Sequence, residues 1–132
     1  MSILRILLFS VVLFLLRIAT EVVLGAPPPE GELSTSVLWN YLLRAHVPDA
    51  LVMIGVFVAL ARVQMRWPYA HALCVIILHG LLAAALLVAL GGDMQPSPLW
   101  PLEWLLMLVS VVIGTEIGRR LRARAEKQAL PA

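Results

Sequence analysis

A long uncharged stretch constrains this chain more than any other feature. Between Trp67 and Gly92 there is no lysine, arginine, aspartate or glutamate, and only His71 and His79 interrupt the apolar residues. A helix needs about 20 predominantly apolar residues to cross the hydrocarbon core of a bilayer. This stretch is therefore long enough to span the membrane with some tilt, and it predicts a transmembrane helix.

The composition extends this prediction to the whole chain. Of its 132 residues, 61% are hydrophobic and 14% are charged, whereas soluble domains are about 45–50% apolar and about 25% charged. A chain with so little polar surface cannot cover itself in water, and its length accommodates about four crossings without a separate soluble domain. We expect an all-α, integral membrane four-helix bundle that forms a single domain over residues 1–132.

Three further apolar segments complete the predicted bundle. The four crossings and a basic tail are predicted, in chain order, at residues 3–24, 37–62, 67–90, 99–118 and 119–132. The second crossing is expected to kink near Pro48, because the uncharged run 50–61 is only about 18 Å long as a helix and must gain length upstream. Aromatic residues typical of the membrane surface flank the second and fourth crossings: Trp39, Tyr41, Trp100 and Trp104.

The first crossing has an alternative interpretation as a cleaved signal peptide, because Arg5 precedes its apolar core and small residues follow it. Arg17 and Glu21 interrupt that core, and prolines 27–29 fall where a peptidase needs an extended site of small residues. These features favour a segment that is retained as a membrane anchor.

The distribution of basic residues predicts the orientation, because lysine and arginine accumulate in short cytoplasmic flanks. The flanks that fall on one side of a four-crossing bundle carry Arg5, Arg62, Arg66, Arg119, Arg120, Arg122, Arg124 and Lys127. The opposite flanks carry Glu30, Glu32 and Asp93, with Arg44 as their basic exception. Both termini are therefore expected in the cytoplasm, with the chain in the inner (plasma) membrane. The net charge of +2 is explained by topology, and no nucleic-acid partner is expected.

Small residues at four-residue spacing predict where helices approach closely. They occur on three crossings, as Gly55 and Ala59, as Gly80 and Ala84, and as Ser110, Gly114 and Gly118. Within lipid, helices associate through close packing of such residues and through polar contacts. The packing partner is either another helix of this chain, another membrane protein or a second copy.

Six polar residues form the candidate site. Ionisable residues within a crossing are costly and are treated by default as functional. At about 1.5 Å of rise per helical residue, six of them lie in one outer layer, about 18–24 Å from the cytoplasmic markers: Arg17, Glu21, His46, Asp49, His79 and Glu103. Three interpretations follow. The acids of neighbouring helices neutralise Arg17 in a structural network; or the layer binds a cation, passes a proton, or holds the head of a quinone or lipid; or it contacts charged residues of a larger partner.

Catalytic motifs are missing from the sequence. There is no phosphate loop, Gly-x-Ser-x-Gly elbow or His-Glu-x-x-His motif, and the single cysteine, Cys74, cannot form a paired-thiol centre. We expect no catalytic residues and no metal site, and at most a haem- or quinone-binding subunit, with haem b ligated by His46 and His79 as the specific possibility. The leading hypothesis is an accessory or interaction subunit of a membrane complex. The alternative is a small transporter, channel or lipid/quinone-binding protein that uses the six polar residues.

Overall fold

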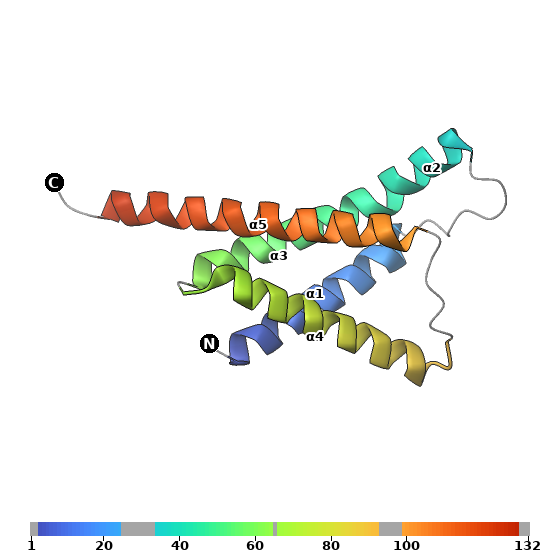
Figure 1. The fold of residues 1–132 in the computed structure, drawn as a ribbon, viewed down its shortest axis with the longest axis horizontal. Coiled ribbons are helices and arrows are strands. Elements are labelled where there is room, and N and C mark those ends of the chain that lie inside the picture. Colours follow the sequence, from blue (N-terminus) through green and yellow to red (C-terminus); the bar gives the residue numbers. More distant parts are fainter. Residues whose placement is uncertain (1–2, 25–33, 65, 93–98, 130–132) are drawn as a thin grey trace.

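The computed structural model describes residues 3–24, 34–64, 66–92 and 99–129. Its helical segments (Figure 1) are α1 (Ile3–Leu24), α2 (Thr35–Tyr41), η1 (Leu42–His46), α3 (Val47–Val63), α4 (Pro68–Ala89) and α5 (Trp100–Ala129). The described residues contain no strand. Four continuous helices are long and apolar enough to cross a membrane, namely Ile3–Leu24, Thr35–Val63, Pro68–Ala89 and Trp100–Gln128. The predicted all-helical fold is confirmed for the described residues, as is the presence of four helices long and apolar enough to cross a membrane.

The outer surface of the helices is largely apolar. Only 17–28% of the most apolar window of each long helix is buried inside the chain, and leucine, valine and isoleucine side chains remain exposed along all of them. Soluble monomers rarely expose contiguous apolar patches larger than a few hundred Å². Together with the four long apolar helices, this exposed surface indicates a membrane protein.

The four long helices pack unequally. α3 packs most extensively against α5, and α1 crosses the bundle in contact with both α4 and α3, whereas α4 and α5 share fewer contacts. Leu13, Phe57 and Val75 lie fully buried in the core between these helices. In Figure 1, α4 and α5 diverge toward the end of the molecule that carries α2. The pocket described below lies at that end.

Glycines on α5 set the contact between α5 and α3. A Cβ atom built on Gly114 would lie 2.7 Å from the carbonyl oxygen of Ile54, and one on Gly118 would lie 2.5 Å from the carbonyl oxygen of Val58. Real Cβ contacts are not this short, so only glycine allows the two backbones to approach so closely. The stripe that also includes Ser110 therefore packs against α3 within the chain.

The other two small-residue stripes do not pack in this way. Gly55 and Gly80 have no atom within 4 Å of a built Cβ among the described residues, and both are exposed, as is Ala59, while Ala84 is only partly buried. The faces of these helices that turn toward their neighbours carry larger residues, such as Phe57 on α3. The expectation of close packing at Gly55 and Ala59 and at Gly80 and Ala84 is not met within this chain.

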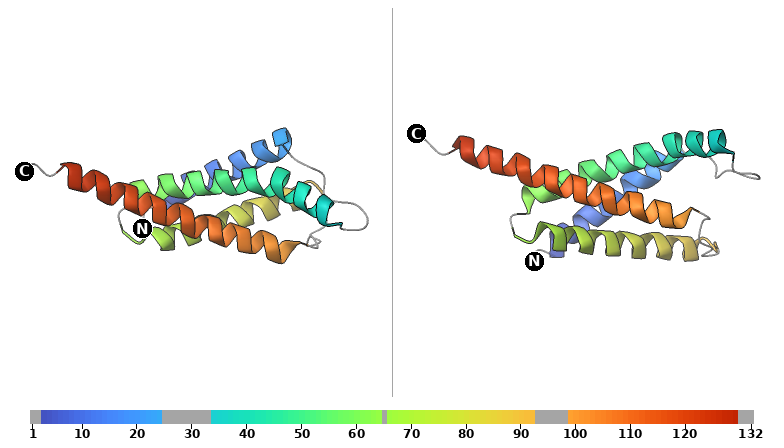
Figure 2. Two further views of the ribbon diagram at one scale, coloured as in Figure 1. Left: turned by 90° about the horizontal axis from the view of Figure 1, so that it is seen from above. Right: turned by 45° about the horizontal axis from the view of Figure 1, so that its top comes forward.

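The second span is continuous through Pro48. Val47 donates its backbone N–H to the carbonyl of Leu42, five residues earlier, which makes Leu42–His46 a π-helical turn. Proline lacks a backbone N–H and its ring clashes with the carbonyl four residues before it, and the wider turn immediately upstream accommodates both effects. Figure 2 shows the helix changing direction between α2 and α3. The irregular turn therefore precedes Pro48, and Pro48 itself does not break the helix.

The fourth span continues beyond its predicted end at residue 118. α5 runs as one helix to Ala129 and extends past the rest of the bundle (Figure 1). Glu116 pairs with Arg120 at 2.8 Å and with Arg119 at 3.4 Å, and Arg122 pairs with Glu126 at 3.5 Å. Such i,i+3 and i,i+4 pairs support a helix. The basic tail is thus largely a continuation of the crossing helix.

Two arginines close the C-terminal end of α3. Arg122 on α5 donates to the carbonyl oxygens of Ala61 at 3.2 Å and Gln64 at 2.7 Å. Arg5 on α1 donates to the carbonyl of Val63 at 3.3 Å and to the Gln64 side chain at 3.2 Å. The last carbonyls of a helix lack intrahelical partners and attract cations. These arginines, which the sequence presents only as topology signals, join three helices at this end.

Arg122→Ala is expected to lower the stability of the bundle by about 1 kcal/mol, because it removes a charged donor from two helix-terminal carbonyls. The measurement is equilibrium unfolding of the purified protein in mixed detergent. Arg124→Ala is the matched control, since Arg124 is exposed on the same helix. Equal losses of stability in the two variants would contradict the capping role of Arg122.

Candidate functional site

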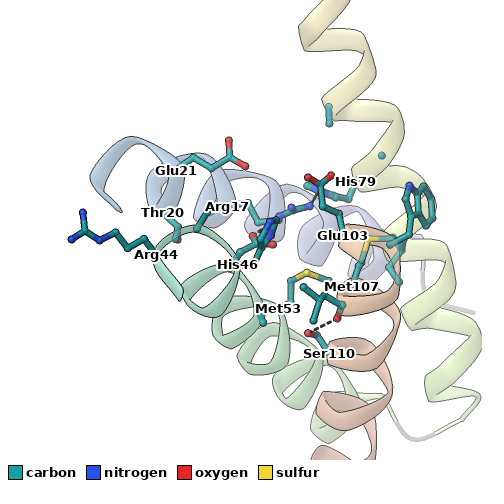
Figure 3. Close-up of a pocket in the computed structure, with 18 of the residues that line it drawn as sticks. Arg17, Thr20, Glu21, Arg44, His46, Met53, His79, Glu103, Met107 and Ser110 are labelled. Atoms are coloured by element: carbon teal, nitrogen blue, oxygen red, sulfur yellow. Dashed lines mark hydrogen bonds and ion pairs between the residues drawn. The ribbon is translucent and has the colours of Figure 1, made fainter. Parts of the chain in front are cut away.

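A pocket with a volume of about 610 Å³ lies among α1, the α2–η1–α3 helix, α4 and α5. Its lining includes all six residues of the predicted polar layer: Arg17, Glu21, His46, Asp49, His79 and Glu103. Every spanning helix contributes at least one of them (Figure 3). The structure therefore brings the six predicted residues together around one pocket. Side chains from all four long helices line it.

Arg17 stands at the centre of the polar contacts. Its Nε donates to Oδ1 of Asp49 at 2.6 Å, and its Nη1 lies 2.8 Å from Nε2 of His79. The side chains of Arg17 and Asp49 are only 26% and 17% exposed. The guanidinium thus connects α1 to both α3 and α4, and Figure 3 shows Glu103 of α5 pointing toward the same group.

The contact with Arg17 defines the protonation state of His79. A guanidinium carries only donors, so Nε2 of His79 must accept the hydrogen bond. The imidazole is then neutral and carries its proton on Nδ1. That Nδ1 atom is buried and has no hydrogen-bond partner among the described residues, and the ring meets Phe14 edge-on with centroids 6.0 Å apart. His79 is only 6% exposed, so the neutral form suits its surroundings.

Arg17 selects Asp49 over the acid on its own helix. Glu21 lies four residues after Arg17, a spacing that allows pairing on one helical face. The hydrogen-bonded ion pair instead joins Arg17 to Asp49 on a different helix, while Glu21 is exposed at the edge of the pocket and points away from the guanidinium in Figure 3. Because electrostatic attraction is stronger in a partly buried, low-dielectric position, the more buried acid is the better partner.

The π-helical turn supplies one wall of the pocket. Arg44, Ala45 and His46, all within η1, line the cavity. The ring of His46 meets the Tyr41 ring nearly at a right angle, with centroids 5.1 Å apart. Its Nε2 is buried without a hydrogen-bond partner among the described residues. π-turns are frequent at functional sites, and this one turns His46 toward the cavity while Arg44 points outward (Figure 3).

The geometry bears on the haem and metal hypotheses. Ligation of haem iron by His79 through Nε2 would require that this atom release Arg17, which lies 2.8 Å away. Within residues 3–24, 34–64, 66–92 and 99–129, no group of three or more histidine, cysteine, aspartate or glutamate side chains is arranged to hold a metal ion. Arg17 instead joins Asp49 and His79 across helices, through one ion pair and one hydrogen bond.

The sequence did not predict the aromatic and methionine residues that line the pocket. The sequence predicts Tyr41 and Trp104 at the membrane surface, yet both line the cavity. Met53 and Met107, which also line it, lie four residues after Asp49 and Glu103, so each is one helical turn away on the same face. Figure 3 shows the two methionines on the side of the pocket away from Glu21. The i+4 spacing was therefore a signal available in the sequence.

No protein-family model, curated protein or solved structure matches the chain. The pocket itself is therefore the basis for assigning a function. Its volume of about 610 Å³ falls within the range of about 300–1,000 Å³ typical of small-molecule sites, which combine apolar walls with a few well-placed polar groups.

Proposed function

We propose that this chain is a small multi-pass membrane protein that binds an amphiphilic small molecule, lipid-like or quinone-like, in the pocket among its four long helices. The supporting observation is that six polar residues from all four helices border one cavity of about 610 Å³. Polar groups in a membrane are costly. A purely structural network is most stable when every buried polar group has a hydrogen-bond partner and no cavity remains. This network instead surrounds a cavity and leaves His46 Nε2 without a partner among the described residues.

The proposed ligand lies with its head and body in different parts of the pocket. Its polar head meets Arg17, Asp49 and His79, and its apolar body lies against Met53 and Met107. These five residues all line the cavity. The chain contributes binding and orientation, and catalysis by the chain alone is not part of the proposal. The surrounding lipid bilayer provides the path by which an amphiphile reaches the site.

The proposal includes the orientation, with both termini cytoplasmic and the protein in the inner (plasma) membrane. It is supported by the placement of the basic residues. The start of α1, the end of α3 and the C-terminal part of α5 lie at one end of the molecule (Figure 1), and these segments carry the arginines of the positive-inside pattern. The pocket, at the opposite end, then lies in the outer half of the membrane.

A second candidate function is an accessory subunit of a membrane complex. It is favoured by Gly55 and Ala59, which lie exposed on α3, with no atom within 4 Å of a Cβ built on Gly55 among the described residues. Such a surface allows the backbone of another helix to approach. The partner is then another membrane protein or a second copy of this chain.

One pair of variants separates the two functions. Gly80 lines the pocket and has open space around a built Cβ, so Gly80→Phe is expected to fill the cavity without a backbone clash. Gly55 has equally open space and lies on a different helix away from the pocket lining, so Gly55→Phe is the matched control. The measurement is native mass spectrometry of each protein extracted in nanodiscs from its own membrane, with an absorption spectrum of the same samples.

The expected result is a bound small-molecule mass in the wild type and in Gly55→Phe that is lost in Gly80→Phe. Retention of that mass in Gly80→Phe would contradict binding in the pocket. A larger protein complex that Gly55→Phe alone dissociates, without a bound small molecule, would support the accessory-subunit function. A haem absorption band in the wild type would instead identify a haem-binding subunit.

A further inference from the structure

The pocket carries an excess of negative charge. Its lining contains the guanidiniums of Arg17 and Arg44 and the carboxylates of Glu21, Asp49 and Glu103, so the formal sum is two positive and three negative charges. His79 adds none while it accepts a hydrogen bond from Arg17. Arg44 and Glu21 are both exposed at the edge of the pocket, and the lining further in holds the guanidinium of Arg17 against the carboxylates of Asp49 and Glu103. The interior therefore favours a ligand of positive charge.

The rest of the lining suits an organic cation. Tyr41 and Trp104 contribute aromatic rings, and Met53 and Met107 contribute polarisable thioethers. Aromatic faces attract ammonium-type cations, and methionine adapts to irregular apolar shapes. A cavity of about 610 Å³ accommodates an apolar body together with the charged head.

Arg17 already occupies the place that such a cation would take. Its guanidinium lies 2.6 Å from Asp49, the carboxylate with which a cationic head would pair. A second acid, Glu21, lies one turn further along α1, within reach of Arg17 by the i,i+4 spacing. Arg17 can therefore exchange one carboxylate for another without leaving an unpaired guanidinium.

We propose that the pocket binds an organic cation with an apolar body, which replaces Arg17 at Asp49 while Arg17 pairs with Glu21. This inference rests on the proposed function, because it assigns the charge of the ligand to the same pocket. The built-in guanidinium acts as a competitor for the site and keeps Asp49 neutralised when the pocket is empty. Neutral and anionic compounds of the same shape are expected to bind more weakly, because they cannot replace the positive charge of Arg17 beside Asp49.

The test uses tetraphenylphosphonium as the cation and tetraphenylborate as an anion of similar shape. Equilibrium dialysis against the wild-type protein in nanodiscs, after subtraction of empty nanodiscs, gives the affinity of each ion. The cation is expected to bind at least about tenfold more tightly than the anion at the pocket. Gly80→Phe abolishes this pocket binding and Gly55→Phe preserves it.

Two carboxylate variants test the exchange of partners. Glu21 is exposed at the edge of the pocket, so Glu21→Gln leaves the fold intact but removes the second partner of Arg17. The affinity for tetraphenylphosphonium is then expected to fall several-fold. Glu126→Gln removes the same charge from the exposed end of α5 and is expected to leave the affinity unchanged. An unchanged affinity in Glu21→Gln would overturn the exchange.

The binding measurements with the two ions test the charge of the ligand separately from the proposed function. If the anion binds the wild-type pocket as tightly as the cation or more tightly, the cation assignment is overturned. If Gly80→Phe abolishes that anion binding, the pocket is still a binding site, and the proposed function stands. Failure of both ions to bind would also overturn the cation assignment. The native mass spectra of Gly80→Phe and Gly55→Phe then decide independently whether the pocket binds an amphiphile at all.

Discussion

Asp49→Asn is expected to destabilise the bundle by about 2–3 kcal/mol. It removes the partly buried counterion of the Arg17 guanidinium and leaves Glu21, an exposed carboxylate at the edge of the pocket, as the alternative partner. Breaking a fully buried pair on one side costs about 3–5 kcal/mol, and the 26% and 17% exposure of the two side chains places this pair below that range. The free energy of unfolding, measured by titration from mild detergent into dodecyl sulfate, reports the loss.

A double-mutant cycle isolates the contribution of the pair. Arg17→Met also destabilises, because it leaves Asp49 unpaired and removes the donor to His79. The double variant Arg17→Met/Asp49→Asn is expected to be more stable than the sum of the single effects predicts, by about 1–2 kcal/mol. Glu21→Gln is the control, since its exposed carboxylate is expected to change the stability by at most about 0.5 kcal/mol. Additive single effects would contradict a coupled pair.

Gly118→Leu is expected to cost about 3 kcal/mol or more, because it forces α5 away from α3. Even the Cβ atom of alanine at this position would lie 2.5 Å from the Val58 carbonyl oxygen and 2.7 Å from Cβ of Ala61. Since the obstacle includes backbone, side-chain rotation cannot relieve it, and the cost exceeds the usual range of about 1–3 kcal/mol for overpacking. Gly114→Leu acts in the same way against Ile54. Both variants are measured by the same unfolding titration and by the yield of folded protein.

Gly55→Ala is the matched control for these two glycines. A Cβ atom there meets nothing within 4 Å among the described residues, and alanine favours a helix over glycine by about 0.5–1 kcal/mol. Its stability is expected to equal or exceed that of the wild type. A Gly118→Leu protein as stable as Gly55→Ala would contradict the close approach of α3 and α5.

The sequence predicted much of the candidate site before any packing was known. Arg17, Asp49, His79 and Glu103 were placed at a common depth because helical rise converts sequence separation into height along each span. Their convergence on one pocket follows that prediction. Depth does not predict which apolar neighbours face the same space, so the sequence signal for Met53 is its i+4 spacing from Asp49 and not its depth.

Hydropathy and helical rise are properties of single helices, and they were sufficient to predict four helices long and apolar enough to cross a membrane and the six polar residues that line one pocket. The rotation of each helix about its own axis, in contrast, depends on which side chains and backbones of neighbouring helices come into contact. The tertiary structure decided it through Gly114 and Gly118 against α3 and through the π-helical turn before Pro48. That packing is the physical reason why Arg17 contacts Asp49 and His79 on other helices, and why the polar residues surround a pocket.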